Sequence, residues 1–227
     1  MKILKIDNIP EIELKEILNE AKILKSLDHP NIIRFNEVFL SKNPLTLNIV
    51  MEYAEGGDLK SLIERNKDEK KLFKETQILD WITQLCLGLK HLHDRKILHR
   101  DIKAQNIFLT QNGMIKIGDF GFAKCLNFTQ EKLQTIIGTP YYFSPELIKN
   151  KPYSFKSDIW SLGVLIYHIS CLKVPFEGKN MIILGEKIMK GTYPKIFSSY
   201  SSHLSEIINS LLQVDFNKRP SVNDILK

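Results

Sequence analysis

Apolar residues recur at helical spacing in several stretches of the chain. From Glu11 to Leu27 and from Thr76 to Asp94 they fall three or four residues apart, which is the spacing of one helix face. We therefore predict an amphipathic helix in each stretch. From Asp158 to Cys171 nearly every position is apolar, which is typical of a helix that is buried on all sides. We expect this third helix at the centre of the larger part of the protein.

Shorter apolar runs predict strands near the N-terminus and in the middle of the chain. Met1–Asp7, Ile32–Phe39 and Leu45–Tyr53 each have the length and residue types of a strand. In the middle, two further apolar runs flank Asn112-Gly113, and this dipeptide between strand-like runs is a strong hairpin signal. A hairpin brings the residues that precede and follow it to one place.

Polar side chains lie in the loops that this hairpin joins. Asp101, Lys103 and Asn106 come before it, and Asp119 follows it. Phosphoryl transfer needs this inventory: a carboxylate to orient the attacking hydroxyl, oxygen ligands for Mg²⁺, and a cation to offset the charge of the transferred group. The sequence therefore predicts a phosphoryl-transfer site here.

Two motifs in this region resemble the eukaryotic protein kinases. Residues 99–106, HRDIKAQN, match the catalytic loop of that family, and residues 119–121, DFG, match its metal-binding triplet. Either motif alone will occur by chance, but the two together, in this order and with apolar flanks, identify the family.

The resemblance implies an α+β, bilobal, protein-kinase-like fold that is a single domain over residues 1–227. A small N-lobe of sheet and helix would comprise residues 1–53, and a large, mainly helical C-lobe residues 59–227. Residues 52–58 would form the hinge. The N-lobe would begin at the family's third strand.

The resemblance also assigns roles to the polar residues of the predicted site. Asp101 would accept the proton of the substrate hydroxyl, and Lys103, which matches the Ser/Thr-specific form of the loop, would meet the γ-phosphate. Asn106 and Asp119 would hold the metal on ATP. The implied cofactors are ATP and Mg²⁺, with Mn²⁺ as the alternative metal.

Further nucleotide contacts are implied nearer the N-terminus. Lys2 would bind the α- and β-phosphates, and Glu20 would hold Lys2, although Glu20 also fits a solvated helix acid. Met51 would be the gatekeeper. The backbone of Glu52 and Ala54 would form hydrogen bonds with adenine.

The segment after the metal-binding triplet is expected to carry regulation and substrate contacts. Arg100 is a suitable partner for a phosphate, and Thr135 is the favoured phosphorylation site, with Thr129 as a second candidate. Thr139 would line the substrate Ser/Thr site. The implied partners are a protein substrate and either an activating kinase or a second copy acting by autophosphorylation.

Longer sequence segments indicate a subfamily within the protein kinases. GTPYYFSPE (Gly138–Glu146), with IKAQNIFLT, GDFGFAK and RPSVNDIL, resembles the NIMA-related (NEK) Ser/Thr kinases. That resemblance implies an ion pair between Glu146 and Arg219 and a bond from Asp158 to the catalytic loop. It also implies cytoskeletal, ciliary, nuclear or cell-cycle roles.

The chain departs from the family before Lys2, where the resemblance implies two strands and a glycine-rich loop. Met1 is either an internal residue of a longer kinase, which is the simpler explanation, or the true start. In the second case we expect poor activity, because the loop supplies N–H groups to the phosphates, and an unprotected sheet edge.

Two other classes of function stay open. A pseudokinase or binding scaffold is favoured by the missing loop and disfavoured by the retained Lys2, Asp101, Asn106 and Asp119. A small-molecule kinase is disfavoured by the long GTPYYFSPE segment, which shapes a peptide site.

Composition excludes little. The net charge is +6 and the pI about 9.0, but Lys and Arg are scattered rather than gathered in a stripe with aromatics, which argues against a nucleic-acid partner. The longest apolar run, at residues 160–172, is interrupted by Gly163 and His168 and is too short to cross a bilayer. We expect a cytoplasmic protein without a membrane partner.

The cysteines, Cys86, Cys125 and Cys171, are far apart and lack CxxC spacing. We predict reduced, buried thiols. For Cys125, which follows Asp119 closely, a reactive thiol near the site is the alternative.

Overall fold

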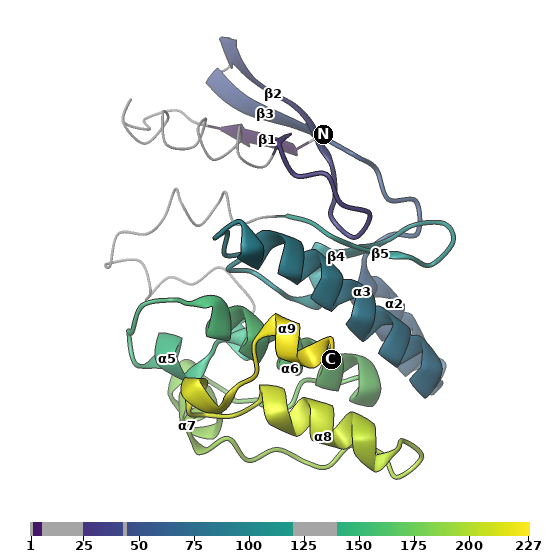
Figure 1. Cartoon of the computed structure of the whole chain (residues 1–227), viewed down its shortest axis with the longest axis vertical. Helices are drawn as coiled ribbons and strands as arrows, with labels where there is room; N and C mark the ends of the chain where they lie inside the picture. The colour runs from purple at the N-terminus through teal and green to yellow at the C-terminus, as the bar shows by residue number, and fades with distance from the viewer. Residues whose placement is uncertain (1, 6–24, 43–44, 120–139) are drawn as a thin grey trace.

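A small antiparallel sheet lies at one end of the molecule, next to a larger and mainly helical part (Figure 1). The computed structural model describes residues 2–5, 25–42, 45–119 and 140–227. Within these residues the two-part α+β arrangement implied by the resemblance is observed. The predicted helix over residues 11–27 lies almost wholly outside them.

The sheet is built from strands that are distant in sequence. In the described residues it has three strands in the order β1-β3-β2, with bounds β1 (Lys2–Lys5), β2 (Phe35–Lys42) and β3 (Leu45–Met51). Lys2 pairs with Ile49 across the β1–β3 ladder, and Phe35 pairs with Met51 across the β2–β3 ladder. The register of β2 shifts between Phe35 and Glu37, so Asn36 is a bulge.

The predicted start of the second strand was wrong, because β2 begins at Phe35 and not at Ile32. The preceding residues pair with a strand of the helical part instead. The N–H of Ile33 donates to the carbonyl of Ile117 at 2.8 Å, and the N–H of Ile117 donates to the carbonyl of Asn31 at 2.8 Å. This short parallel bridge ties residues 31–33 to the helical part.

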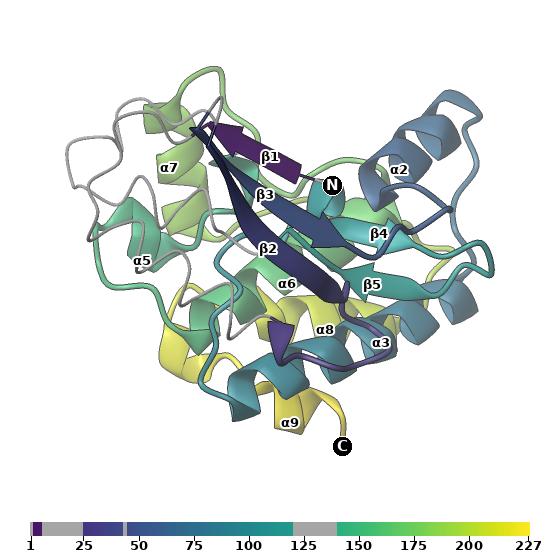
Figure 2. The ribbon, with the colours of Figure 1, turned by 90° about the horizontal axis from the view of Figure 1, so that it is seen from above.

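In the described residues, the helical part contains helices of 4 to 20 residues and a small hairpin. Figure 2 shows α2 at the opposite edge of the molecule from α5 and α7, as in Figure 1. The helices are α2 (Leu59–Asp68), α3 (Glu75–Asp94), α5 (Pro145–Ile148), α6 (Phe155–Cys171), α7 (Met181–Lys190), α8 (Ser202–Leu211) and α9 (Val222–Ile225). Short 3-10 turns are η1 (Ala104–Asn106), η3 (Pro140–Tyr142) and η4 (Phe216–Lys218).

Helix α6 is the buried centre of this part, as predicted. Residues from Ile159 to Tyr167 along it are almost completely buried. It begins at Phe155, three residues before the predicted start, where the N–H of Ser154 donates to the hydroxyl of Ser157 at 3.2 Å. A Cβ at Gly163 would lie 2.8 Å from Leu211 Cβ, so the absence of a side chain there lets α8 approach closely.

The predicted hairpin is confirmed. Strands β4 (Ile107–Leu109) and β5 (Ile115–Ile117) pair antiparallel, and the turn between them places Gly113 at φ +77°. That backbone angle favours glycine. The indole N–H of Trp81 on α3 donates to the Gly113 carbonyl at 3.2 Å, which fixes the turn. The hairpin lies between the sheet and α3 (Figure 1).

Cys86 and Cys171 are buried free thiols, in agreement with the prediction, and Cys125 lies outside the described residues. Burial raises the pKa of the Cys86 thiol to about 12. Among the helices of the described ranges, none combines the length and the apolar character needed to span a membrane.

Candidate active site

Three of the predicted site residues are in direct contact. The ammonium of Lys103 lies 2.7 Å from Asp101 Oδ2. The side-chain amide of Asn106 donates to the same oxygen and to the Asp101 carbonyl, each at 2.8 Å. These contacts fix the Asp101 carboxylate between a cation and an amide donor. Asp101 and Lys103 stay partly exposed, with side-chain exposures of 22% and 19%.

The hairpin delivers Asp119 beside this cluster. The N–H of Gly118 donates to the Asn106 carbonyl at 2.9 Å, so the residue before Asp119 is bonded to the residue that precedes the hairpin. The Gly118 carbonyl lies 3.2 Å from His99 Nε2. A Cβ at Gly118 would lie 2.8 Å from a side-chain carbon of Ile33, so the close approach requires glycine here. Asp119 itself has φ +52°, an uncommon angle for a residue with a side chain.

The buried carboxylate of Asp158 anchors the catalytic loop by hydrogen bonds. Asp158 on α6 is fully buried and accepts hydrogen bonds from the backbone N–H groups of His99 and Arg100, each at 3.0 Å. Its oxygens also lie 2.6 Å from the Tyr153 hydroxyl and 2.9 Å from His93 Nε2. Arg100 is held at φ +67°, and these bonds offset the cost of that angle. The predicted bond from Asp158 to the loop is confirmed.

Asp158 is ionised despite its burial. Burial alone would raise the pKa of its carboxyl, but the hydrogen bond and charge of His93, together with the Tyr153 hydroxyl, bring that pKa below its ordinary value. A negative charge is therefore available to hold the two loop N–H groups.

The backbone of the hinge segment, residues 52–58, is only partly hydrogen-bonded within the protein. The N–H of Glu52 donates to the carbonyl of Arg34 at 2.9 Å, and the N–H of Arg34 donates to Glu52 Oε2 at 3.2 Å. The Ala54 carbonyl accepts the N–H of Gly57 at 3.3 Å. Within the described part of the chain, the Glu52 carbonyl and the Ala54 N–H take part in no hydrogen bond. These two groups, like the backbone groups of Tyr53, are available to a ligand.

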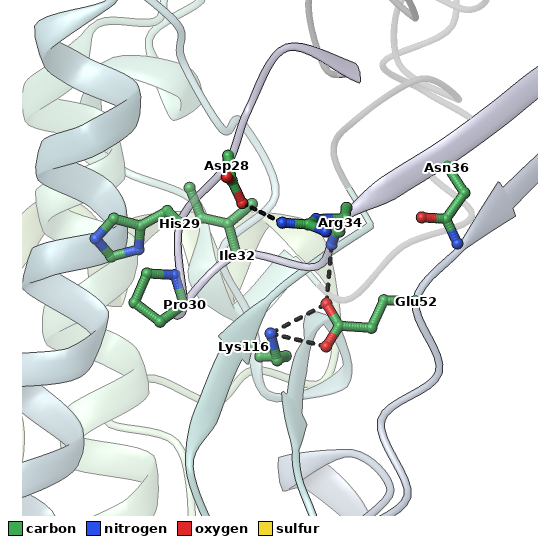
Figure 3. Close-up of a pocket in the computed structure, with 8 residues that line it drawn as sticks. All are labelled: Asp28, His29, Pro30, Ile32, Arg34, Asn36, Glu52 and Lys116. Atoms are coloured by element: carbon green, nitrogen blue, oxygen red, sulfur yellow. Dashed lines mark hydrogen bonds and ion pairs between the residues drawn. The ribbon is translucent and has the colours of Figure 1, made fainter.

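The side chain of Glu52 links the hinge to β5. Figure 3 shows Lys116 and Glu52 pointing toward one another, and the Lys116 ammonium lies 2.8 and 3.0 Å from the two carboxylate oxygens. The Lys116 side chain is only 11% exposed. Both residues line a cavity of about 390 Å³ with Asp28, His29 and Arg34. Of the predicted site residues that the structure describes, Glu52 is the one that lines this cavity.

We expect Lys116→Met to lower the free energy of unfolding by about 1–3 kcal/mol, because a half-buried carboxylate would lose its charged donor. Urea titration of the wild-type and variant chains measures this loss. The matched control is Lys90→Met, since Lys90 pairs with Asp94 at 2.6 Å but both side chains are well exposed. The control should lose under about 1 kcal/mol. Equal losses in the two variants would show that the Lys116–Glu52 pair contributes no more than a surface pair.

The remaining predicted residues have different outcomes. Met51 lies at the end of β3, partly buried and packed against the core, and Lys2 lies on β1. Glu20, Thr135 and Thr139 lie outside the described residues, and so do Thr129 and the proposed contact between Lys2 and Glu20. The predicted roles of these residues stay predictions.

The predicted ion pair of Glu146 and Arg219 is confirmed. Arg219 Nη1 lies 2.8 Å from Glu146 Oε1, and Nη2 lies 2.9 Å from Oε2. Both residues are buried, and Glu146 also accepts the hydroxyl of Ser157 at 2.6 Å. The pair fastens α5 to the C-terminal end of the chain.

Sequence reasoning missed several residues that support the site. Tyr153 and the ring of His93 both reach Asp158. The Tyr142 hydroxyl contacts both His168 and the backbone N–H of Ala104 in the catalytic loop. These residues come from separate elements, so no spacing in the sequence indicates their contacts.

Comparison with known proteins agrees with this geometry. A family model described as the protein kinase domain matches residues 1–227. The chain is 48% identical over 227 residues to serine/threonine-protein kinase Nek1 of Mus musculus, covering 100% of this chain and 18% of Nek1. It is 49% identical over 228 residues to serine/threonine-protein kinase Nek5 of Homo sapiens, covering 100% of this chain and 32% of Nek5.

A solved structure, Rad53 1-466 in complex with AMP-PNP, matches with a TM-score of 0.82 and 29% sequence identity, covering 99% of this chain and 56% of that chain. The chain thus spans 18% and 32% of the lengths of Nek1 and Nek5. The chain belongs to the protein kinase domain family, with the bilobal fold of that family, and within it to the NEK kinases.

Proposed function

We propose that the protein is a Ser/Thr protein kinase, which transfers the γ-phosphoryl group of Mg-ATP to a hydroxyl group of a protein substrate. The observation that carries this proposal is the set of contacts among Asp101, Lys103 and Asn106. The backbone bond from Gly118 to Asn106 brings the neighbouring residue, Asp119, to this set. The names of the relatives, which are serine/threonine-protein kinases, support it.

Asp101 is the proposed proton acceptor. Its carboxylate is partly exposed, so a substrate hydroxyl can reach it. As the γ-phosphorus leaves ADP and bonds to the hydroxyl oxygen, the hydroxyl proton passes to Asp101. Lys103, held at 2.7 Å from Asp101, places a positive charge where the transferred group gains negative charge.

The donor set fits a magnesium ion. The amide nitrogen of Asn106 already donates to the carbonyl and carboxylate of Asp101, which leaves the Asn106 side-chain oxygen for a metal. Asp119 adds a carboxylate, and oxygen ligands of this kind suit Mg²⁺. Bound Mg²⁺ would supply charge neutralisation on the phosphates. The same oxygens suit Mn²⁺.

The free hinge groups fit an adenine ring. The Glu52 carbonyl can accept a hydrogen bond from the adenine amino group, and the Ala54 N–H can donate to a ring nitrogen. Met51, the last residue of β3, is the proposed gatekeeper next to them. The solved structure named above binds AMP-PNP, an analogue of ATP, and supports the choice of nucleotide. Lys2 and Glu20 complete the proposed nucleotide contacts.

Regulation by phosphorylation is part of the proposal. Asp158 fixes the backbone of Arg100 next to Asp101, so a phosphate on Thr135 that paired with Arg100 would act directly on the catalytic loop. Either an activating kinase or autophosphorylation would supply that phosphate. Thr139 is the proposed contact with the substrate.

A labelling experiment tests the proposed function. The chain is incubated with γ-³²P-ATP, Mg²⁺ and dephosphorylated casein as the acceptor, and the casein is then hydrolysed to its amino acids. We expect label on phosphoserine and phosphothreonine, and none when EDTA removes the metal. Label confined to phosphotyrosine, or no label in the presence of Mg²⁺, would contradict the proposal.

A further inference from the structure

A buried tyrosine connects three elements beneath the catalytic loop. Tyr142 ends η3 and is 5% exposed. Its hydroxyl accepts the backbone N–H of Ala104, the first residue of η1, at 3.3 Å, and it lies 2.8 Å from Nδ1 of His168 on α6. Its backbone carbonyl accepts the hydroxyl of Ser161, also on α6, at 3.0 Å. Tyr142 is thus fixed to α6 at two points.

One placement of the protons satisfies every donor in this contact. Ala104 has only an N–H to offer, so the Tyr142 oxygen is the acceptor in that bond. The Tyr142 proton has a partner when Nδ1 of a neutral His168 acts as the acceptor. A protonated His168 would leave the buried Tyr142 proton without a partner, at a cost.

The surroundings of His168 favour this neutral form. Burial, together with the positive charges of Lys67 and Lys60 on α2, lowers the pKa of His168 to about 4. Burial also raises the pKa of the Tyr142 hydroxyl, so that hydroxyl keeps its proton. The chain of donors and acceptors from α6 to the loop is therefore complete near neutral pH.

The contact reaches the residues that would act in catalysis. Ala104 follows Lys103, and η1 runs from Ala104 to Asn106. Ala104 is fully buried, so its N–H depends on a protein partner. Asp158 anchors the loop on the other side of Asp101, through His99 and Arg100. Helix α6 thus holds the loop on both sides of Asp101, through Asp158 directly and through His168 by way of Tyr142.

We propose that Tyr142 and His168 are positioning residues for phosphoryl transfer, which hold Lys103 and Asn106 in register with Asp101 through the Ala104 N–H. The inference rests on the proposed kinase function. Neither side chain needs to touch substrate or nucleotide. Their loss should therefore lower kcat and leave the KM for ATP unchanged.

The first variant is Tyr142→Phe, which removes the hydroxyl and keeps the ring. We expect kcat for casein phosphorylation to fall by about tenfold, with KM for ATP within about twofold of wild type. The matched control is Tyr200→Phe, because the Tyr200 hydroxyl also makes one bond, to the Phe73 carbonyl at 2.8 Å, and lies on a different surface. The control should keep kcat.

A second pair of variants separates hydrogen bonding from packing. His168→Gln retains an acceptor for the Tyr142 proton, and His168→Leu removes it. We expect His168→Gln to keep most of kcat and His168→Leu to match Tyr142→Phe. Equal losses in the two His168 variants, or a change in KM for ATP with constant kcat, would overturn the inference.

Hydrogen exchange tests the same contact without any activity. The Ala104 amide should exchange about tenfold faster in Tyr142→Phe than in wild type, and at the wild-type rate in Tyr200→Phe. Unchanged exchange at Ala104 would overturn the inference even in an active enzyme. If wild type transfers no phosphate while Ala104 exchange responds as expected, the proposed function fails and the contact stands.

Discussion

Asp101→Asn is expected to lower the rate of phosphoryl transfer by about 10²- to 10⁴-fold, which is the usual contribution of a positioned acid or base. Asparagine has nearly the shape of aspartate, and its side-chain oxygen can still accept from Lys103 and Asn106, which contact Asp101 Oδ2 at 2.7 and 2.8 Å. The variant therefore removes the negative charge and the proton acceptor with little change in packing. The measurement is the initial rate of casein phosphorylation at saturating Mg-ATP.

Nucleotide binding provides the control for this prediction. The thermal shift caused by Mg·AMP-PNP should be the same in wild type and Asp101→Asn, because Asp101 is assigned to the substrate hydroxyl and not to the metal. Equal transfer rates in the two proteins would defeat catalysis by the proposed site. A lost thermal shift would instead assign Asp101 to nucleotide binding.

Arg219→Met is expected to lower the free energy of unfolding by about 3–5 kcal/mol, because it leaves the Glu146 carboxylate buried without its charged partner. Arg219 is 1% exposed and also donates to backbone carbonyls of Gln213 and Lys156, each at 2.7 Å. Urea titration measures the change. The control is Lys227→Met, whose exposed pair with Asp224 at 3.4 Å should contribute almost nothing.

The double variant Glu146→Gln with Arg219→Met should recover part of the lost stability, because it also removes the buried charge. A double variant less stable than Arg219→Met would show that the unpaired carboxylate is not the source of the loss.

The same pair makes stability depend on acid. Burial acts to raise the pKa of Glu146, but the hydrogen bonds from Arg219 and Ser157 hold that pKa below its ordinary value of 4.5. A carboxyl group with a lowered pKa stabilises the folded state above its unfolded pKa. The contribution of Glu146 is therefore fully present well above pH 4.5 and is lost as the pH falls through the lowered value. In Arg219→Met this part of the acid dependence should disappear.

Much of the site could be predicted from the sequence because its parts are local. Asp101, Lys103 and Asn106 lie within one short loop, and the Asn112-Gly113 turn returns the chain to Asp119. A motif with such short spacing can be recognised from the sequence without knowledge of the fold. The central position of α6 could also be predicted, because apolar residues occur all around this helix and only a buried position removes them from water.

The supporting contacts could not be predicted because they join residues that are far apart in the chain. Lys116 and Glu52 are 64 residues apart, and His93 and Asp158 are 65 apart. Each is an ordinary polar residue in its own segment, and only packing brings the partners together. The early start assigned to the second strand has a similar cause. Ile32 and Ile33 are apolar, as residues of a buried strand are. They pair with β5 in the helical part instead of joining the three-stranded sheet.

The bridge between residues 31–33 and β5 limits where the three-stranded sheet can rotate relative to the helical part. The bonded residues must travel with the helices, so a tilt of the sheet has to be absorbed just beyond them, at the Asn36 bulge and at Glu52. A few degrees of backbone rotation at these two points would be amplified along β2 and β3 into a larger swing of their far ends. The Lys116–Glu52 ion pair lies at one of these two points and would restrain rotation of the backbone there.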